Sequence, residues 1–434
     1  PSILGGTEVF LEYPDHAGTA VPVLLLVLLL GRAGGQGIGR LVLPAAACLL
    51  LALAQIGDDL TLVAATLPLA VVCALRLLKA RRLSGGERRR AGTVVDKTLL
   101  AATVISVALA KLADLVIRAL GGFDVRPLGG VAIAAPHQVP ANARLLRQSL
   151  ILLFGANNPG RPHQVQTIRA HGALVAMADL HVIGLLLAGA GLAAGIGMIL
   201  ARRTDRGTQL LVAAIMTVLA AGVFTTVLRS LSNAHEVAIL LPLGAALAGR
   251  VLPEAVRVAP SRRPDRARRV SIGGLALGAW LTVSVAELCY AAAWPATPPP
   301  QQAVAAWLTS HHERAGLAGY WQAAATTVTS GGRVLVAPVT LSAVSRVTAP
   351  AAADRWESSA AWYQAAGRDA TFVIAVTGPG VPGGLSPAAV RASFGVPAAE
   401  HEVGQDLIML YRYNLLTRLH GAAFPGAGSV PGTG

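Results

Sequence analysis

The segment Thr98–Leu120 constrains this chain most, because it is almost wholly apolar and yet carries three charged residues. As a helix, its 23 residues would be about 34 Å long, and the hydrocarbon core of a bilayer is about 30 Å thick. Lys111, Asp114 and Arg118 are spaced by three and four residues, so they share one helical face. Ionisable groups in a span usually face other helices, a cavity or a partner. The segment therefore predicts a membrane helix with a polar face.

Two interpretations of this polar face stay open. In the first, Lys111 pairs with Asp114 inside the protein, and Arg118 extends its guanidinium to the membrane interface. In the second, these residues form a wall beneath a site that opens on the outer side. In either case we expect the Lys111 ammonium to bond Asp114, Asp179 or both, because it lies too deep to reach the cytoplasmic boundary.

The composition places the whole chain in a membrane. The 434 residues are 54% hydrophobic and 13% charged, with a mean hydropathy of +0.58, whereas soluble domains carry about 25% charged residues. Arginine, alanine and glycine are abundant and lysine is scarce, which is typical of a high-GC bacterial genome. We therefore expect a polytopic α-helical, multi-pass protein of a bacterial inner (plasma) membrane.

Apolar stretches predict about eight spans. They are Thr19–Gly31, Ile38–Ile56, Leu60–Leu75, Thr98–Leu120, Ala173–Leu200, Leu210–Leu228, Val237–Ala248 and Ile272–Trp294. The expected regions are an outer N-terminal segment at 1–18, a transmembrane helical domain at 19–294 with an outer loop at 121–171, a hinge at 295–300, an extracytoplasmic α/β domain at 301–419 and a disordered tail at 420–434. Because the first residue is Pro1, we also expect an upstream region to be missing.

Basic residues are concentrated in alternate connections between the predicted spans. Four connections, Gly31–Arg40, Arg76–Lys97, Ala201–Thr208 and Gly249–Ser271, hold 20 of the 36 Lys and Arg residues and only five acids. The positive-inside rule places these connections in the cytoplasm. The N-terminal segment, the loop 121–171 and the C-terminal region are then on the outer side. The net charge of +14 is therefore a topology signal, and no nucleic-acid partner is expected.

The region 301–419 alternates short β-rich stretches with helical periodicity, which predicts a small α/β domain. The predicted strands are Leu317–Gln322, Arg333–Val339, Phe372–Thr377 and Leu407–Tyr413, and the predicted helices are Ala303–Arg314 and Pro387–Phe394. Four of the six tryptophans lie here: Trp307, Trp321, Trp356 and Trp362. Their concentration predicts either a packed core or a surface on which glycans stack.

Polar residues gather at the predicted outer ends of the spans, and together they suggest one cavity that opens outward. The candidates for a catalytic base are Asp58, Asp59, Asp114, Asp179 and Glu236. The candidates for binding substrate or a lipid phosphate are Lys111, Arg118, Arg144, Arg147, His181, Arg229 and His235. Each of these residues taken alone also fits a purely structural role.

Within the loop 121–171, Asn142–Phe154 is amphipathic at its start and apolar at its end, which is typical of a helix in the membrane interface. Arg144 and Arg147 lie about one turn apart on it. A guanidinium suits phosphate, so these arginines predict either a lipid-phosphate site or an anchor to anionic headgroups. No nucleotide-binding or metal-binding motif is present, and no cofactor is expected, although a divalent metal stays open.

Two C-terminal segments carry a resemblance to a known family. Ala306–Val339 contains AWL, GLAGYWQA and SGGRVLVAPV, and Phe394–Leu416 contains FG-x-P, EVG and YNLL. With the multiple spans, the outer loop and the C-terminal α/β domain, they resemble the GT-C membrane glycosyltransferases of the protein-mannosyltransferase type. The resemblance covers most of the chain, but its motifs are not catalytic. In this family the acidic catalytic base lies in the first outer loop. We expect most of that loop to precede Pro1, so no residue of this sequence is assigned as the equivalent base.

The resemblance implies transfer of a sugar from a polyprenyl-phosphate donor to an acceptor on the extracytoplasmic face, with a carboxylate deprotonating the acceptor hydroxyl. The expected partners are the lipid bilayer, the polyprenyl-phosphate-linked sugar and an acceptor that the sequence does not identify. The alternative is a non-enzymatic protein, either a membrane transporter or an envelope assembly or binding protein. A transporter should show internal repeats and broken helices, and neither is clear in the sequence.

The charge pattern makes the orientation of the chain testable. A phosphatase or fluorescent reporter fused after Leu419 should report an extracytoplasmic location, because the last basic connection, Gly249–Ser271, is predicted to face the cytoplasm. The same reporter inserted in that connection should give the opposite signal. A cytoplasmic signal from the Leu419 fusion would refute the predicted topology.

Overall fold

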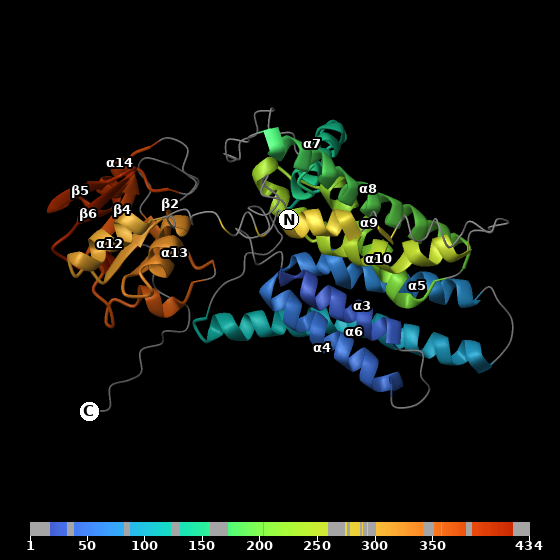
Figure 1. Cartoon of the computed structure of the whole chain (residues 1–434). Helices are drawn as coiled ribbons and strands as arrows, with labels where there is room; N and C mark the ends of the chain where they lie inside the picture. The colour runs from blue at the N-terminus through green and yellow to red at the C-terminus, as the bar shows by residue number, and fades with distance from the viewer. Residues whose placement is uncertain are drawn as a thin grey trace, which may run out of the picture. The chain divides into compact units, whose positions relative to one another are not determined.

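The chain folds into two compact units in its computed structural model (Figure 1). One unit comprises Pro1–Leu112 and Pro127–Trp294, and the other comprises Ala113–Arg126 and Pro295–Gly434. The structure describes residues 18–32, 39–81, 87–122, 131–156, 172–202, 204–258, 274–275, 278–286, 289, 293, 301–341, 351–356, 358–378 and 384–419.

The first unit is helical. Its elements are α3 (Ala20–Arg32), α4 (Gly39–Gly57), the π-helical turn η1 (Leu62–Thr66), α5 (Leu67–Arg81), α6 (Glu87–Ala119), α7 (Val139–Leu153), α8 (Gly172–Leu200), α9 (Arg206–Phe224), the 3-10 helix η3 (Leu231–Val237) and α10 (Leu240–Val258). The last turns of α6, from Ala113, cluster with the second unit.

Several of these helices suit a bilayer. Among the described residues, five helical stretches are long and apolar enough to cross a membrane: Leu62–Arg81, Thr93–Ala119, Leu180–Leu200, Arg206–Phe224 and Asn233–Glu254. The helices α3 and α4 are apolar but shorter. These helices are consistent with the predicted membrane protein. The eighth predicted span, Ile272–Trp294, lies largely outside the described residues.

The predicted connection Arg76–Lys97 is wrong for most of its length, because α5 continues to Arg81 and α6 begins at Glu87. Arginine, lysine and glutamate are good helix formers. Long basic side chains can also reach water from a helix that continues past the hydrocarbon core. The predicted connection Gly249–Ser271 is likewise wrong over its first part, because α10 continues to Val258.

An ion cluster joins three helices at Asp96 of α6. The Asp96 residue is 4% exposed, and its carboxylate accepts hydrogen bonds from Arg206 Nε of α9 at 2.8 Å and from Arg76 Nε of α5 at 3.1 and 3.2 Å. Arg76 also donates through Nη1 to Gln209 Oε1 of α9 at 3.2 Å. A buried carboxylate needs charged partners and hydrogen bonds to offset its lost hydration. The two arginines supply both, so Asp96 fixes α6 against α5 and α9.

Side chains along α6 divide into a packed face and an exposed face. The buried residues recur at spacings of three and four: Asp96, Leu99, Ala102, Thr103, Ser106 and Ala110. Ser106 also accepts a 3.2 Å hydrogen bond from Gln55 Nε2 of α4. The exposed face carries large apolar residues, namely Val104, Ile105, Leu109 and Leu112. This exposed face suits contact with lipid, which makes no demand for polar groups.

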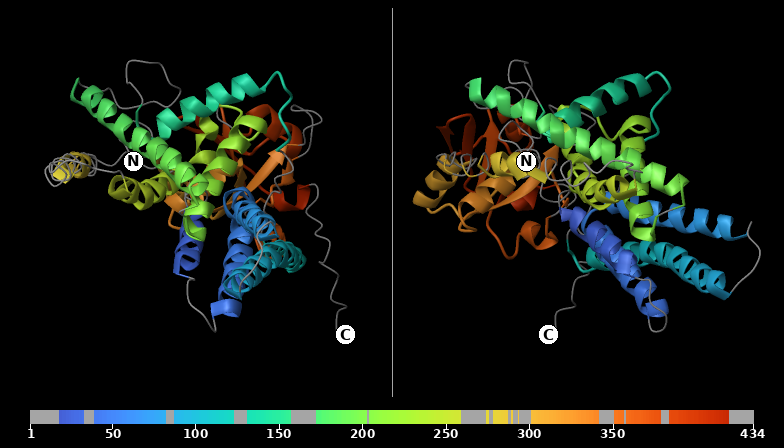
Figure 2. Two further views of the ribbon diagram at one scale, coloured as in Figure 1. Left: turned by 90° about the vertical axis from the view of Figure 1, so that its right-hand side faces the viewer. Right: turned by 45° about the vertical axis from the view of Figure 1, so that its right-hand side comes forward.

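Small residues let α8 and α10 pack closely, as the glycine and alanine content of Ala173–Leu200 predicts. A methyl group added at Gly191 of α8 would lie 2.7 Å from the Cα of Ala248 in α10, well inside contact distance. Figures 1 and 2 show the two helices side by side. Gly191 therefore serves the close approach of two helices.

The second unit contains a six-stranded sheet. Its strands are β1 (Ala315–Ala318), β2 (Leu335–Leu341), β3 (Ala351–Ala353), β4 (Phe372–Val376), β5 (Ala399–Val403) and β6 (Asp406–Leu410), in the spatial order β3-β2-β1-β4-β6-β5. Strand β1 pairs in parallel with both β2 and β4, and the other pairs are antiparallel. The central three strands are therefore parallel, with antiparallel strands at both edges.

Helices cover both faces of this sheet, which makes a three-layer α/β domain. The helices α12 (Gln302–Ser310) and α13 (Tyr320–Thr329) contribute to one core, which includes Val304, Leu308, Ala323, Phe372 and Ile374. The 3-10 helices η4 (Ala360–Tyr363) and η5 (Leu415–Arg418) and the helix α14 (Pro387–Phe394) contribute to the other, which includes Tyr363, Val373, Ala375, Val390 and Leu415. Neighbouring residues of β4 thus point to opposite cores, as the twofold period of a strand requires.

The predicted α/β domain is confirmed as a small mixed sheet with helices, but one predicted strand is misplaced. The strand predicted at Leu317–Gln322 is wrong in its second half, because β1 ends at Ala318 and α13 begins at Tyr320. Gly319 between them is extended, with φ −63° and ψ 157°, and turns the chain from strand to helix. The helix predicted at Pro387–Phe394 is confirmed at both ends.

Asp406, at the start of β6, makes the stability of the second unit depend on pH. Burial raises the pKa of its carboxyl, and a 2.9 Å hydrogen bond from Gln301 Nε2 only partly opposes this. The folded state therefore favours the protonated form, so this contribution is full below the unfolded pKa and is lost as the pH rises through the folded pKa. Asp406→Asn should raise the melting temperature of the full chain at pH 7 by about 1–3 °C and leave it unchanged near pH 3.

Scanning calorimetry at both pH values measures this effect. Asp369→Asn, at an exposed carboxylate of the same unit, is the control and should change neither melting temperature. A stabilisation by Asp406→Asn of equal size at both pH values would contradict the assignment.

Candidate functional site

The turn between α4 and η1 carries the neighbouring carboxylates Asp58 and Asp59. Asp58 closes this turn, since its Oδ1 accepts from the backbone N–H of Leu60 at 2.8 Å and its Oδ2 accepts from the hydroxyl of Thr19. The Asp58 carbonyl also accepts the N–H of Thr61 at 3.1 Å. Such contacts are typical of an aspartate where a helix begins. Asp58 therefore holds the backbone that positions Asp59.

Asp59 forms an ion pair with Lys111 of α6. Its Oδ1 lies 3.2 Å from Lys111 Nζ, and the Asp59 residue is only 7% exposed. The Lys111 side chain is 48% exposed. The sequence predicts Asp114 or Asp179 as the partner of Lys111 and misses Asp59, because no helical spacing links a turn to a residue 52 positions away.

The π-helical turn η1 follows this pair directly. Thr217 Oγ1 of α9 donates a 2.9 Å hydrogen bond to the carbonyl of Val63, inside the turn. The hydroxyl of Thr61, just before it, is fully buried and has no hydrogen-bond partner in the part of the chain that the structure describes. Single π-helical turns within helices occur often at functional sites. An unpaired buried hydroxyl calls for a structural or functional explanation.

A cavity of about 220 Å³ lies beside this turn. Its wall is mostly apolar and consists of Leu60, Val63, Val131, Val218, Ala221, Thr225, Val227, Glu236 and Val237. Glu236 and Thr225 are the two residues of this wall with polar side chains. Leu60, the residue after Asp59, lines the cavity, whereas Asp59 and Lys111 are not among its lining residues.

Glu236 lies in η3, next to His235 in sequence. His235 Nε2 is 3.7 Å from Glu236 Oε1, and the Glu236 side chain is 24% exposed. A carboxylate that is partly exposed in an apolar wall can reach a bound ligand and can accept a proton from it. Of the predicted candidates for a base whose side chains the structure describes, Glu236 is the one that lines this cavity.

The helix α7 packs beside the cavity-lining elements. Its residues Leu146, Ser149, Leu152 and Leu153 are buried, and it contacts α9 and η3. Asn142 Nδ2 holds its first turn by donating to the carbonyls of Val223 and Thr225 at 3.2 and 3.0 Å. The helix predicted at Asn142–Phe154 is therefore confirmed, and its location in the membrane interface stays a prediction.

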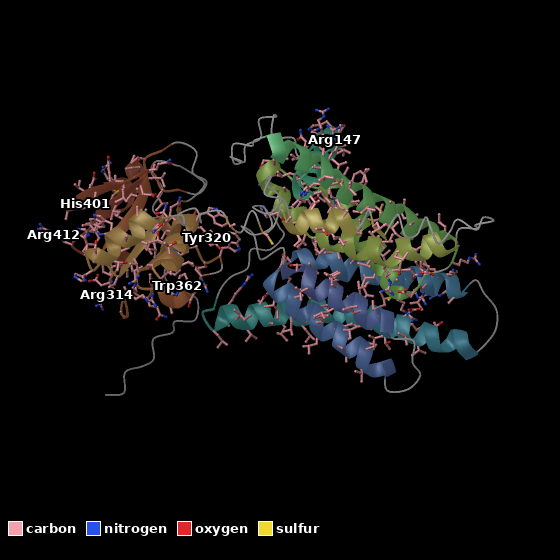
Figure 3. The ribbon with its side chains drawn as sticks, viewed as in Figure 1. Arg147, Arg314, Tyr320, Trp362, His401 and Arg412 are labelled. Atoms are coloured by element: carbon pink, nitrogen blue, oxygen red, sulfur yellow. The ribbon has the colours of Figure 1, made fainter. Side chains whose placement is uncertain are left out.

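The predicted phosphate-binding arginines do not line the cavity. Arg144 and Arg147 lie on the exposed face of α7, and Figure 3 shows Arg147 pointing away from the helices. Arg229 precedes η3 and is exposed. Arg118 belongs to the end of α6 that clusters with the second unit. A basic patch built from these four arginines stays a prediction.

The remaining predicted residues lie elsewhere in the described chain. Asp114 belongs with Arg118 to the end of α6. His181 and Asp179 lie in α8, and the Asp179 side chain is outside the described residues. The structure thus places Glu236 in the wall of the cavity and pairs Asp59 with Lys111 at the turn that leads to it. The other candidates whose side chains are described do not line the cavity.

Comparison with protein-family models, with curated proteins and with solved structures finds no match for this chain. Within the described ranges, no group of three or more His, Cys, Asp or Glu side chains could hold a metal ion. The candidate site therefore rests on the geometry of the cavity and of the residues around it.

Removal of Lys111 tests the ion pair. Lys111→Met would leave the Asp59 carboxylate buried without this partner, so the detergent-extracted protein should lose stability, by somewhat less than the ~3–5 kcal/mol of a fully buried pair. Adding Asp59→Asn should recover part of the loss. Lys79→Met, at an exposed lysine of α5, is the control and should be nearly neutral. Thermal unfolding of all four proteins measures this, and a double variant no more stable than Lys111→Met would reject the pairing.

Proposed function

We propose that the protein is a GT-C-type membrane glycosyltransferase that moves a sugar from a polyprenyl-phosphate donor to an acceptor on the extracytoplasmic face of a bacterial inner membrane. The observation that carries the proposal is the apolar cavity with Glu236 in its wall. The Asp59–Lys111 pair lies in the turn that leads to Leu60, another residue of this wall. The resemblance of the C-terminal segments to GT-C relatives supports the same reaction class.

The chemistry of the cavity suits a lipid-linked sugar. Its apolar wall can receive the isoprenoid part of the donor, since apolar surface is favourably removed from water. In this proposal Lys111, whose side chain is 48% exposed, offers a cation for the phosphate of the donor. A lipid-borne donor is also what a transferase outside the cytoplasm needs, because nucleotide sugars are absent there.

In the proposed reaction, Glu236 accepts the proton of an acceptor hydroxyl while that oxygen attacks the anomeric carbon of the donor. The bond between the anomeric carbon and the phosphate oxygen breaks, and polyprenyl phosphate leaves. Lys111 stabilises the negative charge on this leaving group. Asp59 acts as a positioning residue, because its ion pair holds the lysine at the turn before η1.

An assay of sugar transfer in membranes that contain the full chain tests this proposal. The donors are polyprenyl-phosphate-linked mannose, glucose, galactose and arabinose, each radiolabelled in the sugar. Glu236→Gln should lower the transfer rate by about 10²–10⁴-fold, because the amide cannot accept the proton. Glu254→Gln, at an exposed carboxylate of α10, is the matched control and should keep the rate.

Two outcomes would count against the proposal. Equal rates for Glu236→Gln and the unaltered chain would remove Glu236 as the base. Binding of the labelled donors without any turnover would instead favour the non-enzymatic alternative.

A further inference from the structure

Three aromatic side chains gather in the second unit. Tyr320 stacks on Trp356 with ring centroids 4.4 Å apart and an interplanar angle of 29°. Trp321 meets Tyr320 edge to face, with centroids 5.1 Å apart. Tyr320 and Trp321 are the first two residues of α13, and Trp356 follows β3. Together these three residues form an aromatic platform.

The fold places this platform where the connections of the sheet diverge. The chain leaves β1 through α13 over one face, whereas the route from β2 to β4 includes η4 on the other face. Crevices at the carboxyl ends of parallel strands, where neighbouring connections diverge, are where open α/β sheets bind ligands. Tyr320 follows the carboxyl end of β1, and Figure 3 shows it at the end of the domain opposite Arg314, His401 and Arg412.

Hydrogen bonds inside the domain fix the loop that carries Trp356. The hydroxyl of Tyr363, a residue only 2% exposed, lies 2.6 Å from the carbonyl oxygens of both Pro338 and Asp354. Asp354 Oδ1 accepts the N–H of Trp356 at 3.2 Å. Because these contacts fix the loop to β2, the stacked rings are preorganised, and a ligand would not have to order them.

The domain does not cover the platform completely. Trp321 is 45% exposed, and Tyr320 and Trp356 are partly exposed. Next to them in sequence, Gln322 is 5% exposed, and its Oε1 has no hydrogen-bond partner among the described residues. Buried polar atoms are normally paired. The Gln322 oxygen is buried and does not face solvent, so the partly exposed stacked rings are what indicates a binding surface more than a hydrophobic core.

The chemistry of the platform favours a neutral sugar chain. Aromatic faces attract the C–H groups on one side of a sugar ring, and the hydroxyls at its rim can stay hydrogen-bonded to water. A nucleotide would need cations for its phosphates. The neighbouring Arg355 instead donates to the carbonyl of Gly122 at 3.1 Å.

We infer that the aromatic platform binds a neutral oligosaccharide through stacking on Tyr320, Trp321 and Trp356. The identification of this glycan as the acceptor of the transfer rests on the proposed function. Binding by the platform itself does not require the reaction, so the two claims can be tested apart.

Equilibrium binding to the full chain in lipid nanodiscs tests the inference, without any donor present. The probes are neutral hexaoses of glucose, mannose, galactose and arabinose, followed by tryptophan fluorescence and titration calorimetry. At least one hexaose should bind and shift the emission. Trp321→Ala and Trp356→Ala should each weaken that binding by about tenfold or more, and Trp356→Phe by about threefold or less, because phenylalanine keeps a stacking face.

Trp307→Phe is the matched control. Trp307 stacks on His311 with centroids 3.9 Å apart, away from the platform, so this variant should bind as the unaltered chain does. Melting temperatures of all variants establish that they are folded. Failure of every hexaose to bind would overturn the inference, as would unchanged binding by folded Trp321→Ala and Trp356→Ala. An emission shift caused by nanodisc lipid alone, with none caused by sugar, would assign the platform to the bilayer instead.

The results also separate this inference from the proposed function. Hexaose binding that depends on the platform, with no transfer from any donor, would keep the inference and reject the glycosyltransferase. Sugar transfer that depends on Glu236, without any hexaose binding, would keep the proposed glycosyltransferase and reject the inference about the platform.

Discussion

The ion cluster at Asp96 is the contact on which the arrangement of the helical unit depends. Within lipid, apolar surfaces gain little from meeting one another, because the lipid tails are equally apolar. A buried carboxylate is different, since it is costly until charged partners surround it. Arg76 and Arg206 meet this need and so bring α5 and α9 to α6.

A second ion pair holds α6 about 22 Å further along its axis, at Lys111. Its partner, Asp59, lies in the turn that leads into η1, so the position of α6 determines where this turn lies. The turn and η1 in turn supply Leu60 and Val63 to the cavity. The candidate site is therefore a consequence of two charged contacts on one helix, and Glu236 joins it from η3.

Sequence patterns predicted the features that depend on local composition. Apolar length located the helices, and the alternation of β-rich stretches located the sheet of the second unit. The start of the helix Pro387–Phe394 is marked in the sequence by Ser386, a helix-capping residue, and by Pro387 at the first helical position. In the structure the Ser386 hydroxyl accepts the N–H of Ala389. The polar face of Thr98–Leu120 and the set of outer carboxylates also indicated Lys111 and Asp59, which form an ion pair, and Glu236, which lines the cavity.

Contacts between distant parts of the chain could not be predicted in the same way. Asp96 lies in the predicted basic connection Arg76–Lys97, and nothing in the neighbouring sequence indicates that it is buried between Arg76 and Arg206. The pairing of Lys111 with Asp59 and the π-helical turn η1 likewise depend on how helices meet. The aromatic platform required the fold, because Tyr320 and Trp356 meet only when β1 and β3 take their places in the sheet.

The central claim, that charged contacts fix α6 among its neighbours, is tested most directly by a double-mutant cycle at Asp96 and Arg206. Thermal unfolding of the detergent-extracted protein would be measured for the unaltered chain, Asp96→Asn, Arg206→Gln and the double variant. We predict that both single variants are less stable and that the two losses are coupled by about 1–3 kcal/mol, so that the double variant loses less than their sum. Losses that add within about 0.5 kcal/mol would contradict the claim, because independent residues cannot be what joins α9 to α6.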